Sequence, residues 1–323
     1  MKGVAPLFAV FALGAAATAQ AQTYPARPIT MIVPYASGGP TDVIGRIVAE
    51  RMRTSLGQPI IVDNVGGASG SIGTGRLAHS ASDGYTFGVG SWPTHVVNGA
   101  VYSLQYDLIN DFAPIALITE GPLLIVAKKA LPAKDLKELI GWLKANPDKA
   151  SQGTVGAGSS PHVAGIFFQK QAGTRFQFVP YRGLGPAMQD LLSGQIDIMI
   201  DNPANSLPQI RAGTINAFAV TAKTRVAAEP NIPTVDEAGL PGLYVSVWYA
   251  LFAPKGTPEN IITKLNAAAM DALADSAVRR RLADLAQEIP PYVQQTPQAL
   301  GAYQKAEIDK WWPIIKAANI KGE

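Results

Sequence analysis

The hydrophobic positions of this chain alternate between two periods. Short apolar runs such as 29–33 have the length and the β-branched content of buried strands. The segments that follow them, such as 43–56, place apolar residues every three or four positions, as amphipathic helices do. Residues 29–57 therefore predict a strand, a tight Gly/Ser/Pro loop and a helix. We expect Thr41 or Ser37 to cap the start of that helix and Gly57 to end it.

The same alternation continues along the rest of the chain. Strands that alternate with helices indicate an α/β fold whose sheets are mostly parallel and covered by helices. The pattern predicts further strands at 59–64, 84–90, 111–119, 122–128, 150–155, 176–180, 196–200, 215–221 and 244–252, and helices at 76–80, 133–145, 163–172, 186–192, 258–274, 276–286 and 297–318.

Two strand–helix halves follow one another, which agrees with the two domains expected for 323 residues. The long β-rich run 244–252 comes after the second half, and helices follow it. We expect this run to cross back to the first half, so that two crossover strands form a hinge. The predicted division is residues 22–121 plus 248–323 for domain 1 and 122–247 for domain 2, with a cleft between them.

The first 21 residues have the features of a cleavable secretory signal. Lys2 precedes an apolar stretch, 4–17, and Ala19-Gln20-Ala21 provides small residues for cleavage before Gln22. A short anchor that stays uncut is the alternative. The absence of cysteine from the sequence excludes disulfides and lipid attachment through cysteine. We expect a periplasmic protein if the source is Gram-negative, and no nucleotide or other cofactor, since nucleotide cofactors belong to the cytoplasm.

Composition and charge fit a globular protein that binds no nucleic acid. The chain is 47% hydrophobic and 16% charged, with a formal net charge of +3. The basic cluster Arg279–Arg281 falls on a charged helix face, which predicts a solvated surface and not a nucleic-acid patch.

Loops rich in Gly and Ser recur at the points where strands lead into helices. They lie at 36–41, 66–71, 91–94 and 156–162, and none of them contains Lys or Arg. At a helix N-terminus, unpaired backbone N–H groups and the helix dipole favour an anion. No Lys follows the glycines, as a nucleotide-binding P-loop requires, and the spacing does not fit a dinucleotide-binding fingerprint. The loops therefore predict a site for a carboxylate.

A hydrolytic site is the alternative that these loops leave open. Ser159 or Ser160, His162 and Asp201 supply the residue types of a Ser-His-Asp triad. No G-x-S-x-G motif surrounds any serine, and the spacing of the serines from His162 is more typical of a helix cap. The three histidines are too far apart in sequence to share a helix face, so we expect no metal site.

Several aromatic residues lie near the loops. Trp92, between Ser91 and Pro93, is predicted to be exposed and to form a wall of the binding pocket, whereas Trp248 is assigned to the core. Arg182 is the cation predicted to reach a distal carboxylate, with a surface salt bridge as its alternative.

In this order and spacing, the motifs resemble those of the solute-binding proteins of tripartite tricarboxylate transporters, also called Bug-type receptors. The resemblance covers essentially all of the chain after residue 22. It is carried by YPARPITMIVPYASGGPTDVIGR, VDNVGGASGSIGTGRLAHSASDGYTF, PDKASQGTVGAGSSPH, VPYRGLGPAMQDLLSGQIDIMID, PQIRAGTINAFAV, PNIPTVDEAGLPG and WYALFAPKGTPENIITKLN.

The resemblance implies a type II periplasmic binding protein, in which two α/β domains joined by two crossover strands close on a small carboxylate. Asp201 is awkward beside a carboxylate, so we expect it to contact a ligand amine or hydroxyl, or a backbone N–H. The ligand-binding residues that the resemblance and the loops imply are Tyr35, Ser37, Gly38, Gly39, Thr41, Ser69, Ser91, Trp92, Thr94, Gly158, Ser159, Ser160, His162, Tyr181 and Asp201.

The sequence thus predicts a receptor and not an enzyme. It is expected to be a monomer that captures a di- or tricarboxylate or an aromatic acid by hinge closure and delivers it to permease subunits in the cytoplasmic membrane. Trp92 and Tyr35 favour a flat or aromatic acid. A periplasmic hydrolase and a ligand sensor for a signalling partner remain the alternatives.

Overall fold

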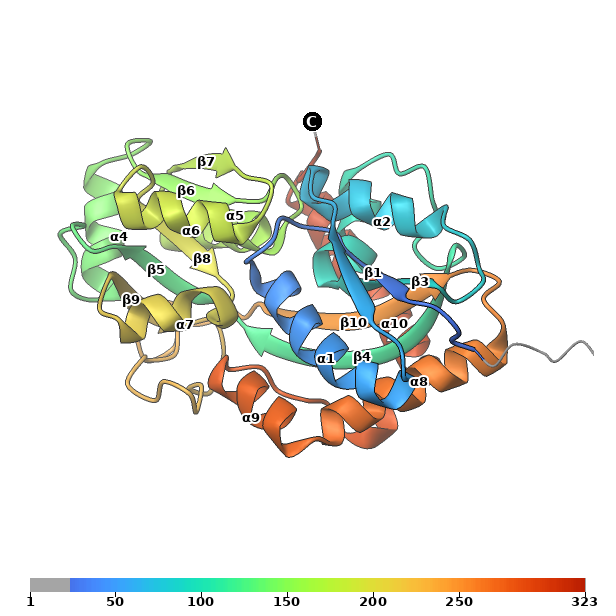
Figure 1. The fold of residues 1–323 in the computed structure, drawn as a ribbon. Coiled ribbons are helices and arrows are strands. Elements are labelled where there is room, and N and C mark those ends of the chain that lie inside the picture. Colours follow the sequence, from blue (N-terminus) through green and yellow to red (C-terminus); the bar gives the residue numbers. More distant parts are fainter. Residues whose placement is uncertain (1–23, 323) are drawn as a thin grey trace, which may run out of the picture.

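The computed structural model of the chain describes residues 24–322 and contains two five-stranded sheets, each flanked by helices (Figure 1). The predicted signal peptide and its cleavage point lie outside the described residues. Among those residues, no helix combines the length and the apolar character needed to cross a membrane.

The first sheet joins the beginning of the chain to its end. Its strand order is β2-β1-β3-β10-β4, in which β2, β1 and β3 run parallel and β10 is antiparallel to both of its neighbours. Helices α8 and α10 pack against β4, and α1 packs against α8 and α9. The elements are β1 (Ile29–Val33), α1 (Pro40–Leu56), β2 (Ile60–Asn64), α2 (Ser71–Ala78), β3 (Thr86–Ser91), α3 (Asn98–Val101), β4 (Phe112–Pro122), β10 (Ser246–Pro254), α8 (Glu259–Ala274), α9 (Ser276–Asp284) and α10 (Pro297–Ala317).

The second sheet is formed by the middle of the chain. Its order is β7-β6-β8-β5-β9, with β7, β6 and β8 parallel and β5 antiparallel to both β8 and β9. The elements are β5 (Leu124–Lys128), α4 (Leu136–Ala145), β6 (Ser151–Thr154), α5 (Ser160–Ala172), β7 (Gln177–Pro180), α6 (Leu184–Ser193), β8 (Ile198–Asp201), α7 (Pro203–Arg211) and β9 (Ile215–Val220).

The expectation of mostly parallel sheets is confirmed for four of the five strands in each sheet, which run in one direction, and is wrong for the fifth, which is antiparallel to both of its neighbours. These strands, β10 and β5, lie next to the two connections between the sheets. A strand that enters a sheet directly from the other domain needs no helical crossover, so it is free to pair antiparallel. The α/β class and the two-domain organisation are confirmed.

Two connections join the sheets, and Thr221 links them. The first runs from the end of β4 through Leu123 into β5, and the second leads from β9 to β10. The backbone N–H of Leu123 donates to the hydroxyl of Thr221 (2.9 Å), which donates to the carbonyl oxygen of Val245 (2.8 Å). Figure 1 shows β10 and β4, two neighbouring strands of the first sheet, side by side and leading toward the second sheet. The domain limits at 121/122 and 247/248 stay a prediction.

The helices agree with the predicted pattern except in three places. Helix α2 covers Ser71–Ala78, so it begins five residues before the predicted helix 76–80. Helix α7 was not predicted; Asn202 caps it by accepting a hydrogen bond from the N–H of Ala204, and Pro203 occupies its first turn. After β3, the expected polar loop is instead a π-helical turn, Pro93–Val97, that continues into α3. The basic cluster Arg279–Arg281 is exposed on α9, as predicted.

Candidate functional site

A cavity of about 350 Å³ lies between the two domains. Elements of the first sheet supply most of its wall, and the second sheet contributes Val155, Ser160 and Leu184. None of the lining residues is charged. They are Tyr35, Gly39, Pro40, Thr41, Ser91, Pro93, Val155, Ser160, Leu184, Val247 and Tyr249.

The start of helix α1 forms one side of the cavity. Gly39 is its N-cap, with extended backbone angles (φ −84°, ψ 174°), and no side chain caps the helix. The expectation that Thr41 or Ser37 caps α1 is therefore wrong. Because no side chain covers the start of the helix, its positive end faces the cavity, which Gly39, Pro40 and Thr41 line.

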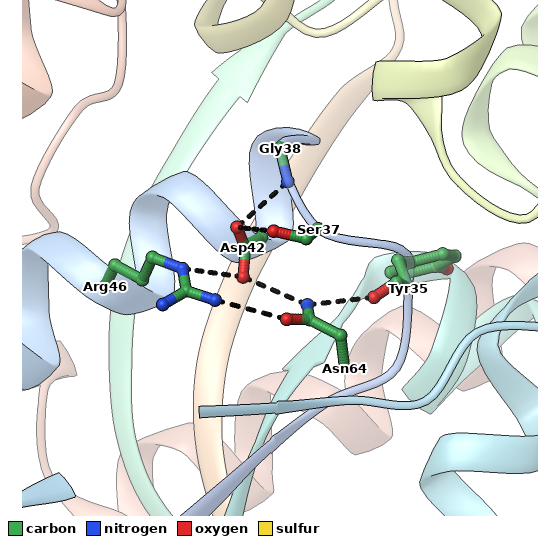
Figure 2. A network of polar contacts seen from close by, with 6 residues as sticks. All are labelled: Tyr35, Ser37, Gly38, Asp42, Arg46 and Asn64. Carbon is green, nitrogen blue, oxygen red and sulfur yellow. Dashed lines mark hydrogen bonds and ion pairs between the residues drawn. The ribbon is translucent and has the colours of Figure 1, made fainter. Parts of the chain in front are cut away.

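The buried carboxylate of Asp42 holds the loop before α1 in place (Figure 2). It accepts hydrogen bonds from the N–H of Gly38 (2.9 Å) and from the hydroxyl of Ser37 (3.2 Å). Ser37 and Gly38 were predicted to bind the ligand, but their donors are directed to Asp42 and neither residue lines the cavity. Gly38 has a φ of +85°, which a side chain would strain.

Two further residues bind the other oxygen of Asp42. The guanidinium Nε of Arg46 donates to it (2.9 Å), and so does the amide of Asn64 (3.0 Å), which also donates to the carbonyl oxygen of Tyr35 (3.0 Å). Burial by itself raises the pKa of Asp42, but the hydrogen bonds from Arg46, Gly38 and Asn64 outweigh burial, so the net shift is downward. The carboxylate therefore stays charged at neutral pH and ties the loop to β2.

Two helices of the second domain also begin at the cavity. Ser160 and Leu184 are the first residues of α5 and α6, and no side chain caps either helix. The hydroxyl of the preceding Ser159 donates to the carbonyl oxygen of Gly156 (2.7 Å) instead. Three uncapped helix N-termini, from both domains, thus meet around one uncharged space, which is an arrangement that favours an anion.

Two tyrosines provide hydroxyl groups at the cavity. The hydroxyl of Tyr35 donates to the carbonyl oxygen of Ser69 (3.1 Å), and that of Tyr249 accepts from the amide of Asn202 (3.2 Å). Burial raises the pKa of both phenols, so both keep their protons at neutral pH. Tyr249 was not among the predicted residues. It faces Ser91 because β10 pairs with β3 in that register.

The prediction that Trp92 is exposed and lines the pocket is wrong. Trp92 is fully buried and packs edge-on against Trp311 of α10, with ring centroids 4.9 Å apart. The π-helical turn that follows β3 directs its side chain into the core instead of the cleft. Trp248 is buried in the core, as predicted.

Two other residues predicted to bind ligand are buried behind the cavity. The hydroxyl of Thr94 accepts a hydrogen bond from the N–H of Ser91 (2.9 Å) and so fixes the turn after β3. Ser69 is also fully buried and presents its carbonyl oxygen to Tyr35. Both shape the wall of the cavity without lining it.

Gly158, His162 and Tyr181 do not line the cavity either. His162 and Tyr181 line a second hollow between the domains, and a Cβ atom at Gly158 would meet Val101 of the first domain at 3.2 Å. The hydroxyl of Tyr181 donates to the carboxylate of Asp190 (2.7 Å). Burial lowers the pKa of His162 to about 4, so its imidazole is neutral at neutral pH.

Asp201 is fully buried and does not line the cavity. One carboxyl oxygen accepts from the hydroxyl of Ser206 (2.5 Å) and the amide of Asn205 (2.7 Å), while the other has no hydrogen-bond partner. Burial raises its pKa to about 7, although these hydrogen bonds act in the opposite direction.

The structure does not assemble the triad considered from the sequence. The partners of Asp201 are Ser206 and Asn205, and the Nδ1 atom of His162 accepts from the N–H of Gly158 (3.3 Å). No hydrogen bond among the described residues connects Ser159 or Ser160 to His162. Within residues 24–322, no group of three His, Asp or Glu side chains is placed to hold a metal ion.

Comparison with known proteins assigns the family. Residues 44–320 match the family described as the tripartite tricarboxylate transporter family receptor. The protein BugT of Bordetella pertussis is 37% identical over 310 residues, which make up 95% of this chain and 94% of BugT.

Solved structures agree with this match. The structure of MatC from Rhodopseudomonas palustris, described with bound malate, has a TM-score of 0.87 and 40% identity and covers 90% of this chain and all of MatC. Another R. palustris protein, described with adipate, has a TM-score of 0.87 and 34% identity over 92% of this chain and 99% of its own. The chain therefore belongs to the tripartite tricarboxylate transporter receptor family, whose members are Bug-type solute-binding proteins and not enzymes.

Proposed function

We propose that this protein is a periplasmic receptor that captures a small carboxylate between its two domains and delivers it to a membrane permease. The observation that carries the proposal is the uncharged cavity at which helices α1, α5 and α6 all begin without a side-chain cap. Each helix N-terminus stabilises a nearby negative charge by about 0.3–1 kcal/mol, and by up to about 2 kcal/mol when partly buried.

Closure of the domains is the proposed mechanism of capture. Because the cavity is lined from both sides, a ligand contacts all of its wall only when the domains are together, so it binds the closed state better than the open one. The closed population then rises with ligand concentration. The permease would recognise this closed form.

An aliphatic acid of the size of malate or adipate is the proposed ligand. Both acids accompany family members of similar fold. The prediction of a flat or aromatic acid depends on Trp92 and Tyr35, and of these two residues Trp92 is in the core and only Tyr35 lines the cavity.

Family membership supports the proposed partner, location and non-enzymatic role. The family is described as the receptor of a tripartite tricarboxylate transporter. This description supports permease subunits as the partner and the periplasm as the compartment. A sensor role remains the second candidate, since capture by closure suits a signalling partner equally well.

A thermal-shift panel on protein purified from the periplasm tests the binding function. The panel holds malate, succinate, adipate, citrate and benzoate, with the neutral diamide of adipate as the uncharged control. At about 100 times its dissociation constant, a ligand should stabilise the protein by roughly 2.7 kcal/mol. At least one aliphatic acid should raise the melting temperature and the diamide should not. No shift with any acid would overturn the proposal.

Two further measurements separate the alternatives. Hydrolysis of p-nitrophenyl acetate at a rate that Ser160→Ala abolishes would favour the hydrolase, whereas we expect no turnover in either protein. Uptake of the radiolabelled acid by cells that lack the gene, compared with complemented cells, distinguishes transport from sensing. Uptake that is equal in the two strains would contradict delivery to a permease.

A further inference from the structure

A second hollow of about 1,150 Å³ lies at the boundary between the domains, next to the cavity. We call it the rim groove. The two hollows share Val155 as part of their walls. Residues of the first domain, including Tyr102 and Lys321, form one side of the rim groove, and residues of the second domain, including His162 and Arg182, form the other.

The charge of the rim groove is of one sign. Arg182 and Lys321 line it, and no Asp or Glu is among its lining residues. Both side chains are exposed, and within residues 24–322 neither forms an ion pair or a side-chain hydrogen bond. His162 adds no charge at neutral pH, because burial lowers its pKa to about 4.

The backbone holds both cations at the groove. Lys321 follows the buried Ile320, and the next residue, Gly322, donates its N–H to the carbonyl oxygen of Val101 (3.0 Å). The carbonyl oxygen of Arg182 accepts a hydrogen bond from the N–H of Ala36 (3.1 Å), which belongs to the other domain. One cation is thus fixed on each domain, at the edge of the same groove.

The rim groove and the cavity divide two tasks that an anion receptor must perform. The cavity has neutral walls and acts on an anion at short range, through helix N-termini. Two unpaired cations act over a distance of about 8 Å at physiological ionic strength. A cleft lined by one sign of charge raises the local concentration of oppositely charged solutes and their rate of association.

We propose that the rim groove is an anion-capture site, in which Arg182 and Lys321 attract the carboxylate ligand and hold it loosely before it passes into the cavity. This inference rests on the proposed function, since it concerns the same ligand. The two cations set the rate of association and leave the rate of dissociation unchanged, because they do not line the cavity in which the ligand rests.

The test is a stopped-flow measurement of ligand association, followed by tryptophan fluorescence, in the double variant Arg182→Gln/Lys321→Gln. The probe is malate or adipate, whichever stabilises the wild-type protein more in the panel above. The matched control is Arg280→Gln/Lys137→Gln, which removes the same charges from exposed side chains of α9 and α4 that line neither hollow. The two double variants have the same net charge, so only the position of the charges differs.

At an ionic strength of about 0.01 M, we expect the association rate constant to fall about 3- to 10-fold in Arg182→Gln/Lys321→Gln and to change less than twofold in the control. At about 1 M salt, where the Debye length is about 3 Å, the difference should vanish. An equal rate in the two variants, or a slower association that persists at high salt, would overturn the capture site. So would a faster dissociation, since it would place the cations on the bound ligand.

Failure of this inference is distinguishable from failure of the proposed function. If a panel acid binds and the rates of the two variants agree, only the capture site is wrong. If no acid of the panel binds the wild-type protein, the proposed function fails and the capture site fails with it.

Discussion

The backbone N–H of Ala36 donates a hydrogen bond to the carbonyl oxygen of Arg182, over 3.1 Å and across the boundary between the two domains. Ala36 lies in the loop after β1, and Arg182 lies two residues before α6. Two of the three helix N-termini at the cavity, those of α1 and α6, are therefore joined by a direct contact of their preceding loops. The contact requires backbone to approach backbone, which is possible because glycines flank it.

Gly66 is the glycine whose replacement should most directly oppose closure. A Cβ atom at this position would lie 2.7 Å from the carbonyl oxygen of Arg182, which is closer than van der Waals contact allows. Gly66→Ala should therefore destabilise the closed state and raise the dissociation constant for malate or adipate at least about tenfold, a loss of about 1.4 kcal/mol. Isothermal titration calorimetry measures the affinity.

The fold itself should tolerate this change. The shortest contact lies between the domains, and a second one, 3.1 Å to the backbone nitrogen of Ala36, lies within the first domain, so the free energy of unfolding without ligand should fall by no more than about 1 kcal/mol. Gly141→Ala is the control, because nothing lies within 4 Å of a Cβ atom there. Gly141 is inside helix α4, so alanine should stabilise the protein by about 1 kcal/mol and leave the affinity unchanged. Equal affinities in the two variants would contradict the role of the contact.

Asp42→Asn should loosen the loop before α1. An amide at this position cannot accept from Gly38, Ser37, Arg46 and Asn64 together, so part of the network in Figure 2 is lost. We expect the free energy of unfolding to fall by about 1–3 kcal/mol and the ligand affinity to fall about tenfold. Urea denaturation and calorimetry check the two effects.

Asp63→Asn is the matched control for Asp42→Asn. Asp63 forms an ion pair with Arg76 (2.8 Å), but both side chains are partly exposed to solvent, so its loss should cost at most about 1 kcal/mol. The affinity should not change. If the two variants lose the same affinity, the carboxylate of Asp42 does not position the loop.

The sequence predicts the strand–loop–helix units well because their signals are local. The period of the apolar residues predicts helices α1 and α5. The Gly/Ser loops before them correctly mark where these helices begin, which is at the cavity. Helix α7 was missed because its segment contains Pro208 and lacks a regular apolar stripe. The start of α7 is marked in the sequence by one residue only, the N-cap Asn202, and one residue is too weak a signal to predict a helix.

The composition of the cavity wall could be predicted only in part, because it depends on contacts between distant segments. Tyr249 lies at the cavity because β10 pairs with β3 and places it opposite Ser91. The residues next to Tyr249 in the sequence do not indicate this pairing. Trp92 has polar neighbours in sequence, yet α10, more than 200 residues later, covers it. Lys321 lies at the rim groove because its two neighbours hold the backbone there: Ile320 is buried, and Gly322 donates a hydrogen bond to Val101.

Thr221 should stabilise the protein by connecting the two crossings between the sheets. Its buried hydroxyl accepts from the N–H of Leu123 and donates to the carbonyl oxygen of Val245. Thr221→Val keeps the shape and leaves both backbone groups without this partner, which should lower the free energy of unfolding by about 1–3 kcal/mol in urea denaturation. Thr221→Ser keeps the hydroxyl and should restore most of the loss. A serine variant as unstable as the valine variant would assign the effect to packing.

Asp201 should make the stability of the protein depend on pH between about 4 and 7. Burial raises its pKa to about 7 in the folded state, whereas an aspartate in the unfolded chain has a pKa of about 3.9. Between these values the folded state keeps a proton that the unfolded state has released, so stability falls as pH rises through this window and levels off above it. At 1.36 kcal/mol per pKa unit, the fall is up to about 4 kcal/mol.

Asp201→Asn removes this titration and isolates its contribution. Its amide oxygen can still accept from Ser206 and Asn205, so the variant should gain stability relative to the wild-type protein as pH rises from 4.5 to 7.5 in urea denaturation. Asp197→Asn is the control with the opposite sign. The hydrogen bonds from Lys128 and Ser151 outweigh burial and lower the pKa of Asp197, so its carboxylate stabilises the fold throughout this range and its loss should cost a nearly constant amount. If the curves of the wild type and of Asp201→Asn run parallel, then the carboxyl group of Asp201 does not hold a proton in the folded protein, and its burial is compensated in another way.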